Sequence, residues 1–289
     1  MSAAVADEHT DNEMSELPPG KDEPFDLFRD DHLAAVERAA GTLYLDCLAD
    51  EGYPQERALA QGAEPTFAAL DEPPLQPTTV AEARRHGLGG PVPAQSAKIV
   101  RTDPAFQRVA ESCLGTAGDR LGGAAEVSEV RDRYGRLGNE LVKARGEAVQ
   151  QLVGRSTGAF AGCLAEHGFR LPDGETFDPS ATADLFGVPL GANEPPRRAD
   201  PPRVRELPAD AELVPGTREQ DYVPTDRERR YAVALVTCLR STGLLTQVED
   251  ELPALQQQIV QEHAAELADL NPRLQALADR ARAVLAPRS

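Results

Sequence analysis

The chain has 289 residues and a formal net charge of −18, from 48 acidic and 30 basic side chains. This balance argues against a nucleic acid or an anionic membrane surface as partner, because both require a net basic face. No segment approaches the roughly 18 consecutive apolar residues of a membrane-spanning helix. Hydrophobic residues make up 40% of the chain but aromatic residues only 4%. Any core must therefore consist mainly of Ala, Leu and Val.

The first segment, residues 1–24, contains seven acidic side chains and one Lys. Low hydrophobicity and high net charge predict a disordered acidic arm there. The segment has neither the basic start nor the apolar run of a signal peptide.

Helical periodicity begins after this arm. Apolar residues at helical spacing predict a helix over 26–51. Residues 54–104 contain eight prolines, so we expect an irregular segment there with one short helix near 81–86. A short helix over 103–115 should start at Asp103 as N-cap, followed by Pro104.

A long helix is predicted from 124 to 167, although its internal glycines weaken the pattern. Residues 170–224 contain ten prolines, which predicts a linker or a loop draped over helices. Helix resumes over 226–239 and continues as a coiled-coil-like extension over 251–289, with a break or kink at Pro272. No strand-like alternation is visible, so the predicted fold class is mostly α, with long Pro-rich loops and a long C-terminal helix.

All four cysteines share one local pattern: each is followed by Leu and, five residues after the cysteine, by Gly. Gly is favoured just after a helix because it adopts the left-handed conformation without strain. The pattern predicts each cysteine in the last turn or so of a helix that ends at Gly. The four cysteines are Cys47, Cys113, Cys163 and Cys238.

Two types of cysteine segment alternate along the chain. Cys47 and Cys163 have aromatic residues three before and six after, whereas Cys113 and Cys238 have one seven before. Between the two types lies a shared Ala-x-Ala-x-x-(His or Phe)-Gly string, over 81–87 and 181–187. This repeated order predicts an internal duplication. We expect an arm (1–24), helical unit 1 (25–123), helical unit 2 (124–250, with the loop 170–224) and the extension (251–289).

The even number and shared pattern of the cysteines allow two interpretations. In a reducing compartment they are buried apolar residues, and in an oxidising compartment they form disulfides. Four cysteines allow three connectivities. Self-contained repeat units favour Cys47–Cys113 and Cys163–Cys238. A four-cysteine zinc site is disfavoured because no C-x₂₋₄-C pair occurs.

Catalytic signals are weak in this sequence. His86 aligns with Phe186 of the second string, which indicates packing, and His167 precedes the helix-ending Gly168, where a cation or donor suits the helix dipole. The Gly87–Gly90 string follows no predicted strand, and no H-E-x-x-H motif occurs. We therefore assign no catalytic, cofactor-binding or metal-binding residue and expect no cofactor.

The cysteine strings carry a family resemblance that covers most of residues 30–286. The chain resembles uncharacterised exported proteins of actinobacteria, commonly lipoproteins, with repeated aromatic-x-x-Cys-Met/Leu-x-x-x-Gly-aromatic segments. The matching strings are Tyr44-x-x-Cys47-Leu48-x-x-x-Gly52-Tyr53, Phe160-x-x-Cys163-Leu164-x-x-x-Gly168-Phe169 and Cys238-x-x-x-Thr242-Gly243-Leu244. The resemblance implies a cell-envelope or secreted location and brings no established chemistry. This chain departs from the family in showing no signal peptide or lipobox, which leaves open an earlier start, a shortened chain or a member that stays inside the cell.

We expect a non-enzymatic, disulfide-stabilised protein of the cell envelope that acts as a binding or scaffold module for a protein partner. One alternative is an enzyme or small-ligand-binding protein with a site between the two units, near His86 and His167. A second alternative is a cytoplasmic coiled-coil protein that binds its partner through residues 252–286.

Overall fold

The computed structural model describes residues 24–59, 66–73, 75–101, 103–172, 175, 182–199, 207 and 211–286. The predicted acidic arm lies outside these residues apart from Pro24, as do parts of the Pro-rich loop 170–224. Within the described residues the protein is mostly helical, as the sequence predicts.

Nine α-helices form the described part of the protein. They are α1 (Asp30–Asp50), α2 (Val80–His86), α3 (Pro104–Arg120), α4 (Ala124–Gly154), α5 (Thr157–Glu166), α6 (Thr182–Leu185), α7 (Asp226–Ser241), α8 (Leu244–Glu262) and α9 (Ala264–Leu285). Short 3₁₀ helices cover η1 (Pro24–Leu27), η2 (Pro54–Leu59) and η3 (Ala68–Leu70). Four short strands complete it: β1 (Lys98–Arg101), β2 (Ala192–Asn193), β3 (Ala211–Val214) and β4 (Tyr222–Val223).

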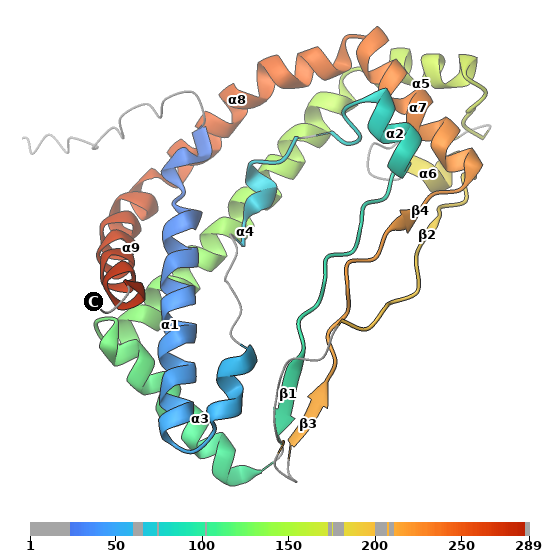
Figure 1. Cartoon of the computed structure of the whole chain (residues 1–289). Helices are drawn as coiled ribbons and strands as arrows, with labels where there is room; N and C mark the ends of the chain where they lie inside the picture. The colour runs from blue at the N-terminus through green and yellow to red at the C-terminus, as the bar shows by residue number, and fades with distance from the viewer. Residues whose placement is uncertain are drawn as a thin grey trace, which may run out of the picture.

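These elements form an open frame with two helical ends (Figure 1). One end contains α1, α3 and α9, which pack on one another through α1. The other contains α2, α5, α6 and α7, with α2 and α5 packed against α7. Helices α4 and α8 pack together and run between the two ends, and an extended β-ribbon connects the same ends along the other side.

The β-ribbon is a departure from the prediction, which expected no strands. Strand β1 pairs antiparallel with β3, and the bridges Val92–Gln220 and Gln95–Thr217 continue the same register. Strand β2 pairs with β4, and the bridge Arg198–Thr217 continues that ladder. Residues 211–223 are thus the middle strand of three. Prolines interrupt all three segments, which keeps the strands too short to show alternation in the sequence.

Helix boundaries differ from the prediction at three places. Helix α3 continues past 115 to Arg120. The long helix predicted over 124–167 is two helices, α4 and α5, because the chain breaks after Gly154. Contacts with α8 fix this break: Arg155 Nη1 lies 2.9 Å from Glu251 Oε2, and Ser156 Oγ donates to Gln247 Oε1 at 3.0 Å.

Of the break or kink predicted at Pro272, the break is wrong, because α9 runs through Pro272 and the helix is interrupted at His263 instead. Buried leucines hold the helix together on both sides of Pro272, and their burial outweighs the hydrogen bond that proline cannot donate. They are Leu267, Leu270, Leu274 and Leu277. The apolar face expected to form a coiled coil is therefore buried within this chain's own core.

The core is centred on Tyr134 of α4, whose ring is fully buried and stacks on Phe28 with 4.4 Å between ring centroids. Its hydroxyl donates to Asn271 Oδ1 at 3.1 Å and accepts from the Arg29 N–H. Burial raises the pKa of Tyr134 well above its usual range. The hydroxyl therefore joins α4, α9 and the start of α1 as a neutral group.

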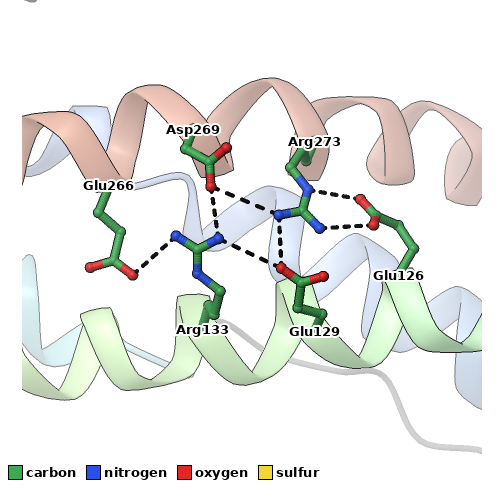
Figure 2. Close-up of polar contacts among 6 residues, drawn as sticks. All are labelled: Glu126, Glu129, Arg133, Glu266, Asp269 and Arg273. Atoms are coloured by element: carbon green, nitrogen blue, oxygen red, sulfur yellow. Dashed lines mark hydrogen bonds and ion pairs between the residues drawn. The ribbon is translucent and has the colours of Figure 1, made fainter.

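An ion-pair network joins α4 to α9 above this core (Figure 2). Arg273 binds Glu126 through two 2.8 Å hydrogen bonds and Glu129 through one of 3.0 Å. Arg133 of α4 lies 2.7 Å from Asp269 of α9. Hydrogen bonds from Arg273 are the main reason that the pKa values of Glu126 and Glu129 are lowered.

Removing Arg273 should make stability less dependent on pH. A lowered carboxylate pKa stabilises the fold above the unfolded value of about 4.3, and this contribution is lost as pH falls through the folded value. Arg273→Ala should lower Tm by a few degrees at most near pH 7, because the network is partly exposed.

The difference in Tm between wild type and Arg273→Ala should shrink below about pH 4. Thermal melts from pH 3 to pH 8 measure it. Arg136→Ala is the control, because this exposed arginine of α4 has no hydrogen bond or ion pair with any described residue. A difference in Tm that stays constant across this pH range would contradict the conclusion that Arg273 lowers the pKa values of Glu126 and Glu129.

Candidate functional site

Two disulfides fasten the two ends of the frame. Cys47 at the end of α1 bonds Cys113 of α3, with 5.6 Å between their Cα atoms. Cys163 of α5 bonds Cys238 of α7, with 5.7 Å between their Cα atoms. These are the pairs that the sequence analysis favoured. We name the surroundings of Cys47–Cys113 corner 1 and those of Cys163–Cys238 corner 2.

The local geometry of the two corners is nearly the same. Tyr53 and Phe106 meet edge to face in corner 1, with centroids 5.0 Å apart and an interplanar angle of 77°. Phe169 and Tyr231 do so in corner 2, at 5.0 Å and 76°. These aromatic residues stand six positions after one cysteine and seven before its partner. The corners therefore repeat one structural motif, while duplication of the whole units stays a prediction.

The glycine that ends the first helix of each corner has a left-handed backbone, as predicted. Gly52 has φ 98° and Gly168 has φ 87°. The next N–H, of Tyr53 or Phe169, donates back to Leu48 O at 2.8 Å or Leu164 O at 2.9 Å. This helix stop is the Schellman type, and it turns the aromatic residue toward the disulfide partner.

Cys113 departs from the prediction that each cysteine precedes a helix-ending Gly. Helix α3 continues past Gly118, which is buried. A Cβ at Gly118 would lie 2.6 Å from Ala124 Cα. Gly118 is therefore required for the close approach of α3 and α4, not for a helix end.

The corners differ in what surrounds their aromatic pairs. In corner 1, Arg101 lies over the rings of Tyr53 and Phe106 and donates to the buried Glu56 at 3.0 Å. In corner 2, Phe186 packs against Tyr231 at 5.3 Å.

Corner 2 also has His167 at the position where corner 1 has Glu51. Its imidazole nitrogen lies within 4.8 Å of both disulfide sulfurs. Because those sulfurs are bonded to each other, neither supplies a thiolate to a metal ion.

Glu228 of α7 holds corner 2 to the β-ribbon. Its carboxylate is fully buried and accepts hydrogen bonds from Leu88 N at 2.9 Å, Gly191 N at 2.6 Å and Thr225 N at 3.3 Å. The Tyr222 hydroxyl donates to both oxygens at 3.0 Å. Burial, followed by this hydrogen bond, raises the pKa of Tyr222, which keeps the hydroxyl a donor. One carboxylate thus joins four chain segments.

Three glycines in or just after the two Ala/Gly strings allow this contact. A Cβ at Gly87 would lie 2.6 Å from Glu228 Oε1, and a Cβ at Gly89 would collide with the ring of Tyr222. At Gly191, which follows the second string, a Cβ would collide with Val223 O. Close packing around Glu228 and Tyr222 therefore explains Gly87 and Gly89.

A cavity of about 650 Å³ lies between α2, the end of α5 and the first half of α7. We name it the arginine pocket. It is lined by Arg84, His167, Gly168, Phe169, Arg227, Arg229, Arg230, Val233 and Ala234. None of the described residues that line it carries a carboxylate.

Two of its four arginines are occupied by neighbouring groups. Arg227 donates to Phe186 O at 3.2 Å, and Arg229 pairs with Asp226 at 3.0 Å. Arg84 and Arg230 are exposed and form no hydrogen bond or ion pair with any residue that the structure describes. The pocket therefore offers two unpaired guanidinium groups above the buried Phe169 and Ala234.

The alternative hypothesis of a shared histidine site finds no support in this geometry. His167 lines the arginine pocket, whereas His86 lines a different cavity of about 490 Å³, formed with Gly87 and the residues that follow it. The arginine pocket does lie between elements of both predicted units. The sequence analysis missed its arginines, although three of them fall within 227–230, a basic segment of an acidic chain.

No known protein family, curated protein or solved structure matches this chain. Among the helices that the structure describes, none is both long enough and apolar enough to cross a membrane.

Glu228→Gln should destabilise the protein by about 2–3 kcal/mol. An amide NH₂ would then face at least one backbone N–H that now donates to the carboxylate, leaving a buried donor without an acceptor. Glu82→Gln is the matched control, since Glu82 holds the same position in the capping box of α2 but is exposed to water. Urea unfolding monitored by circular dichroism should show a much smaller change for Glu82→Gln, and equal effects would refute this role of Glu228.

Each disulfide should contribute a similar amount to stability. The bonds close loops with sequence separations of 66 and 75 residues. In the chain-entropy model each is worth about 4 kcal/mol. The double variants Cys47→Ser/Cys113→Ser and Cys163→Ser/Cys238→Ser should therefore lose comparable free energies of unfolding in non-reducing urea titrations. A negligible loss of unfolding free energy for either pair would contradict the expected entropic contribution of that disulfide.

Proposed function

We propose that the protein is a non-enzymatic scaffold of the cell envelope that binds a protein partner. The observation that carries this proposal is the pair of disulfide corners at opposite ends of the frame (Figure 1). Disulfides persist in oxidising compartments outside the cytoplasm and are rare inside it. The resemblance to exported actinobacterial proteins supports the same location.

Rigidity supports the scaffold role. Each corner joins two helices covalently, and α4, α8 and the ribbon connect the corners. We expect these connections to limit the movement of the two ends relative to each other before any partner binds. Such preorganisation lowers the entropic cost of binding.

The coiled-coil alternative is less well supported. It requires the apolar face of residues 252–286 for a partner helix, and the leucines of α9 on that face are buried against the chain's own core. The small-ligand alternative gains one observation, the arginine pocket, which a protein partner can equally use.

This proposal is tested by mapping the disulfides of the protein isolated from its native organism. Cells are fractionated after thiols have been blocked with an alkylating reagent, and the protein is digested without reduction. We expect it in the envelope or secreted fraction, with peptides joining Cys47 to Cys113 and Cys163 to Cys238. Four alkylated thiols in a cytoplasmic fraction would contradict the proposed location.

Partner binding is tested in the same cells with a photo-crosslinking residue at Leu114 or Leu190, whose side chains are 59% and 53% exposed. Leu114 adjoins corner 1, and Leu190 lies between α6 and the ribbon. A discrete crosslinked protein from at least one position is expected. Its absence from both positions would contradict the scaffold role.

A further inference from the structure

We propose that the arginine pocket binds an acidic peptide segment of the protein partner. Carboxylates of the segment pair with Arg84 and Arg230, and an apolar side chain next to them packs on Phe169, Val233 and Ala234. This inference rests on the proposed function in one respect, namely that the partner is a protein.

The charge of the pocket is opposite to that of the chain. The protein has a net charge of −18, yet the described residues that line the pocket include four arginines and a histidine and no carboxylate. Charges of one sign along a concave, low-dielectric wall raise the local concentration of counter-ions of the other sign. The pocket is therefore a local site of attraction for anionic groups.

Arg84 and Arg230 are not neutralised by carboxylates of the described residues, which favours a binding site over a structural ion-pair network. Elsewhere in the fold, arginines such as Arg133 and Arg273 are neutralised by carboxylates of the chain. Arg84 and Arg230 have no such partner among the described residues, so a ligand displaces no internal contact. Planar guanidinium groups bind carboxylates through paired hydrogen bonds.

Three separate segments hold the pocket in shape. Arg230 and Ala234 are four residues apart on α7 and so lie on one face of it. Helix α2, which supplies Arg84, packs on α7 next to the hydrogen bond from Leu88 N to Glu228. The third segment, His167–Phe169, is fixed by the disulfide between Cys163 and Cys238. The charges are thus positioned before the ligand binds.

The size of the pocket and the mixture of charged and apolar residues that line it favour a peptide as ligand. Its volume of about 650 Å³ exceeds what one small anion fills. Of its lining residues, Arg84 and Arg230 are exposed, whereas Phe169 and Ala234 are buried and apolar. A segment that alternates acidic and apolar side chains matches both kinds of lining residue. An anionic lipid surface would be repelled by the remainder of the chain.

The described residues around corner 1 form no second copy of this site. The cavity of about 450 Å³ between α1, α3 and α4 contains one arginine, Arg131, and it pairs with Glu37 at 3.1 Å. We therefore expect a single acidic segment per chain.

Fluorescence anisotropy tests the inference on the full, oxidised protein. The probes are fluorescein-labelled hexapeptides in which Asp or Glu alternates with Leu, Val or Phe, together with the same peptides carrying Lys in place of the acids. We expect saturable one-to-one binding of the acidic set only, weakened several-fold between 0.15 M and 0.5 M salt because the charges are screened.

Arg84→Ala/Arg230→Ala should weaken binding by about tenfold or more, because two charge-assisted contacts are lost. The matched control is Arg85→Ala/Arg136→Ala, which removes the same charge from α2 and α4 outside the pocket. It should change Kd less than about twofold. Circular dichroism melts verify that all variants remain folded, as expected for exposed side chains without internal partners.

Several outcomes would overturn the inference. Binding that is equal in both double variants, or absent from the wild type across the peptide set, would exclude the pocket as the peptide site. Citrate, inorganic phosphate or phosphatidylglycerol vesicles binding the pocket as tightly as the peptides would replace the peptide by another anion. If the peptides do not bind, the proposed location still stands, because disulfide mapping tests the location separately. Conversely, a cytoplasmic location would leave the result of the peptide titration valid.

Discussion

The buried carboxylate of Glu228 is the contact on which one end of this structure depends. It accepts hydrogen bonds from the segments after α2 and α6, from Tyr222 of the ribbon and from the N-terminus of its own helix. A buried charge is tolerated only where its hydrogen-bonding capacity is filled, and here four donors fill it. Glycine at 87, 89 and 191 follows from this contact, because a Cβ at any of them would collide with the converging groups.

The disulfide corners and this carboxylate act together on the arginine pocket. The bond between Cys163 and Cys238 places His167 and Phe169 beside α7, while the hydrogen bond between Leu88 and Glu228 fixes α2, with Arg84, on the other side. A basic pocket in a chain of net charge −18 is therefore held together by a disulfide and a hydrogen bond that involve neither Arg84 nor Arg230. Mutation of Arg84 and Arg230 can therefore test the proposed function separately from the fold, since neither forms a hydrogen bond or ion pair with any described residue.

Much of the fold could be predicted from local patterns. Helical spacing located α1, α4 and α7, and the capping box at Thr225 marked the start of α7. The failures have physical causes. Pro272 sits within a helix because leucines on both sides of it are buried, and α4 ends at Gly154 where Arg155 and Ser156 contact α8. In both cases, contacts between distant segments outweigh the local preference.

The sequence by itself determined the mostly helical class and the repeated cysteine pattern, because both depend on spacing along the chain. It also favoured the two disulfide pairs through the logic of a repeat. Only the tertiary structure decided that β1 pairs with β3, that α2 packs on α7, and that Arg84 meets Arg230 across one pocket. Those pairs lie more than 100 positions apart, and no local periodicity records which side chains burial and hydrogen bonding bring together over such a distance.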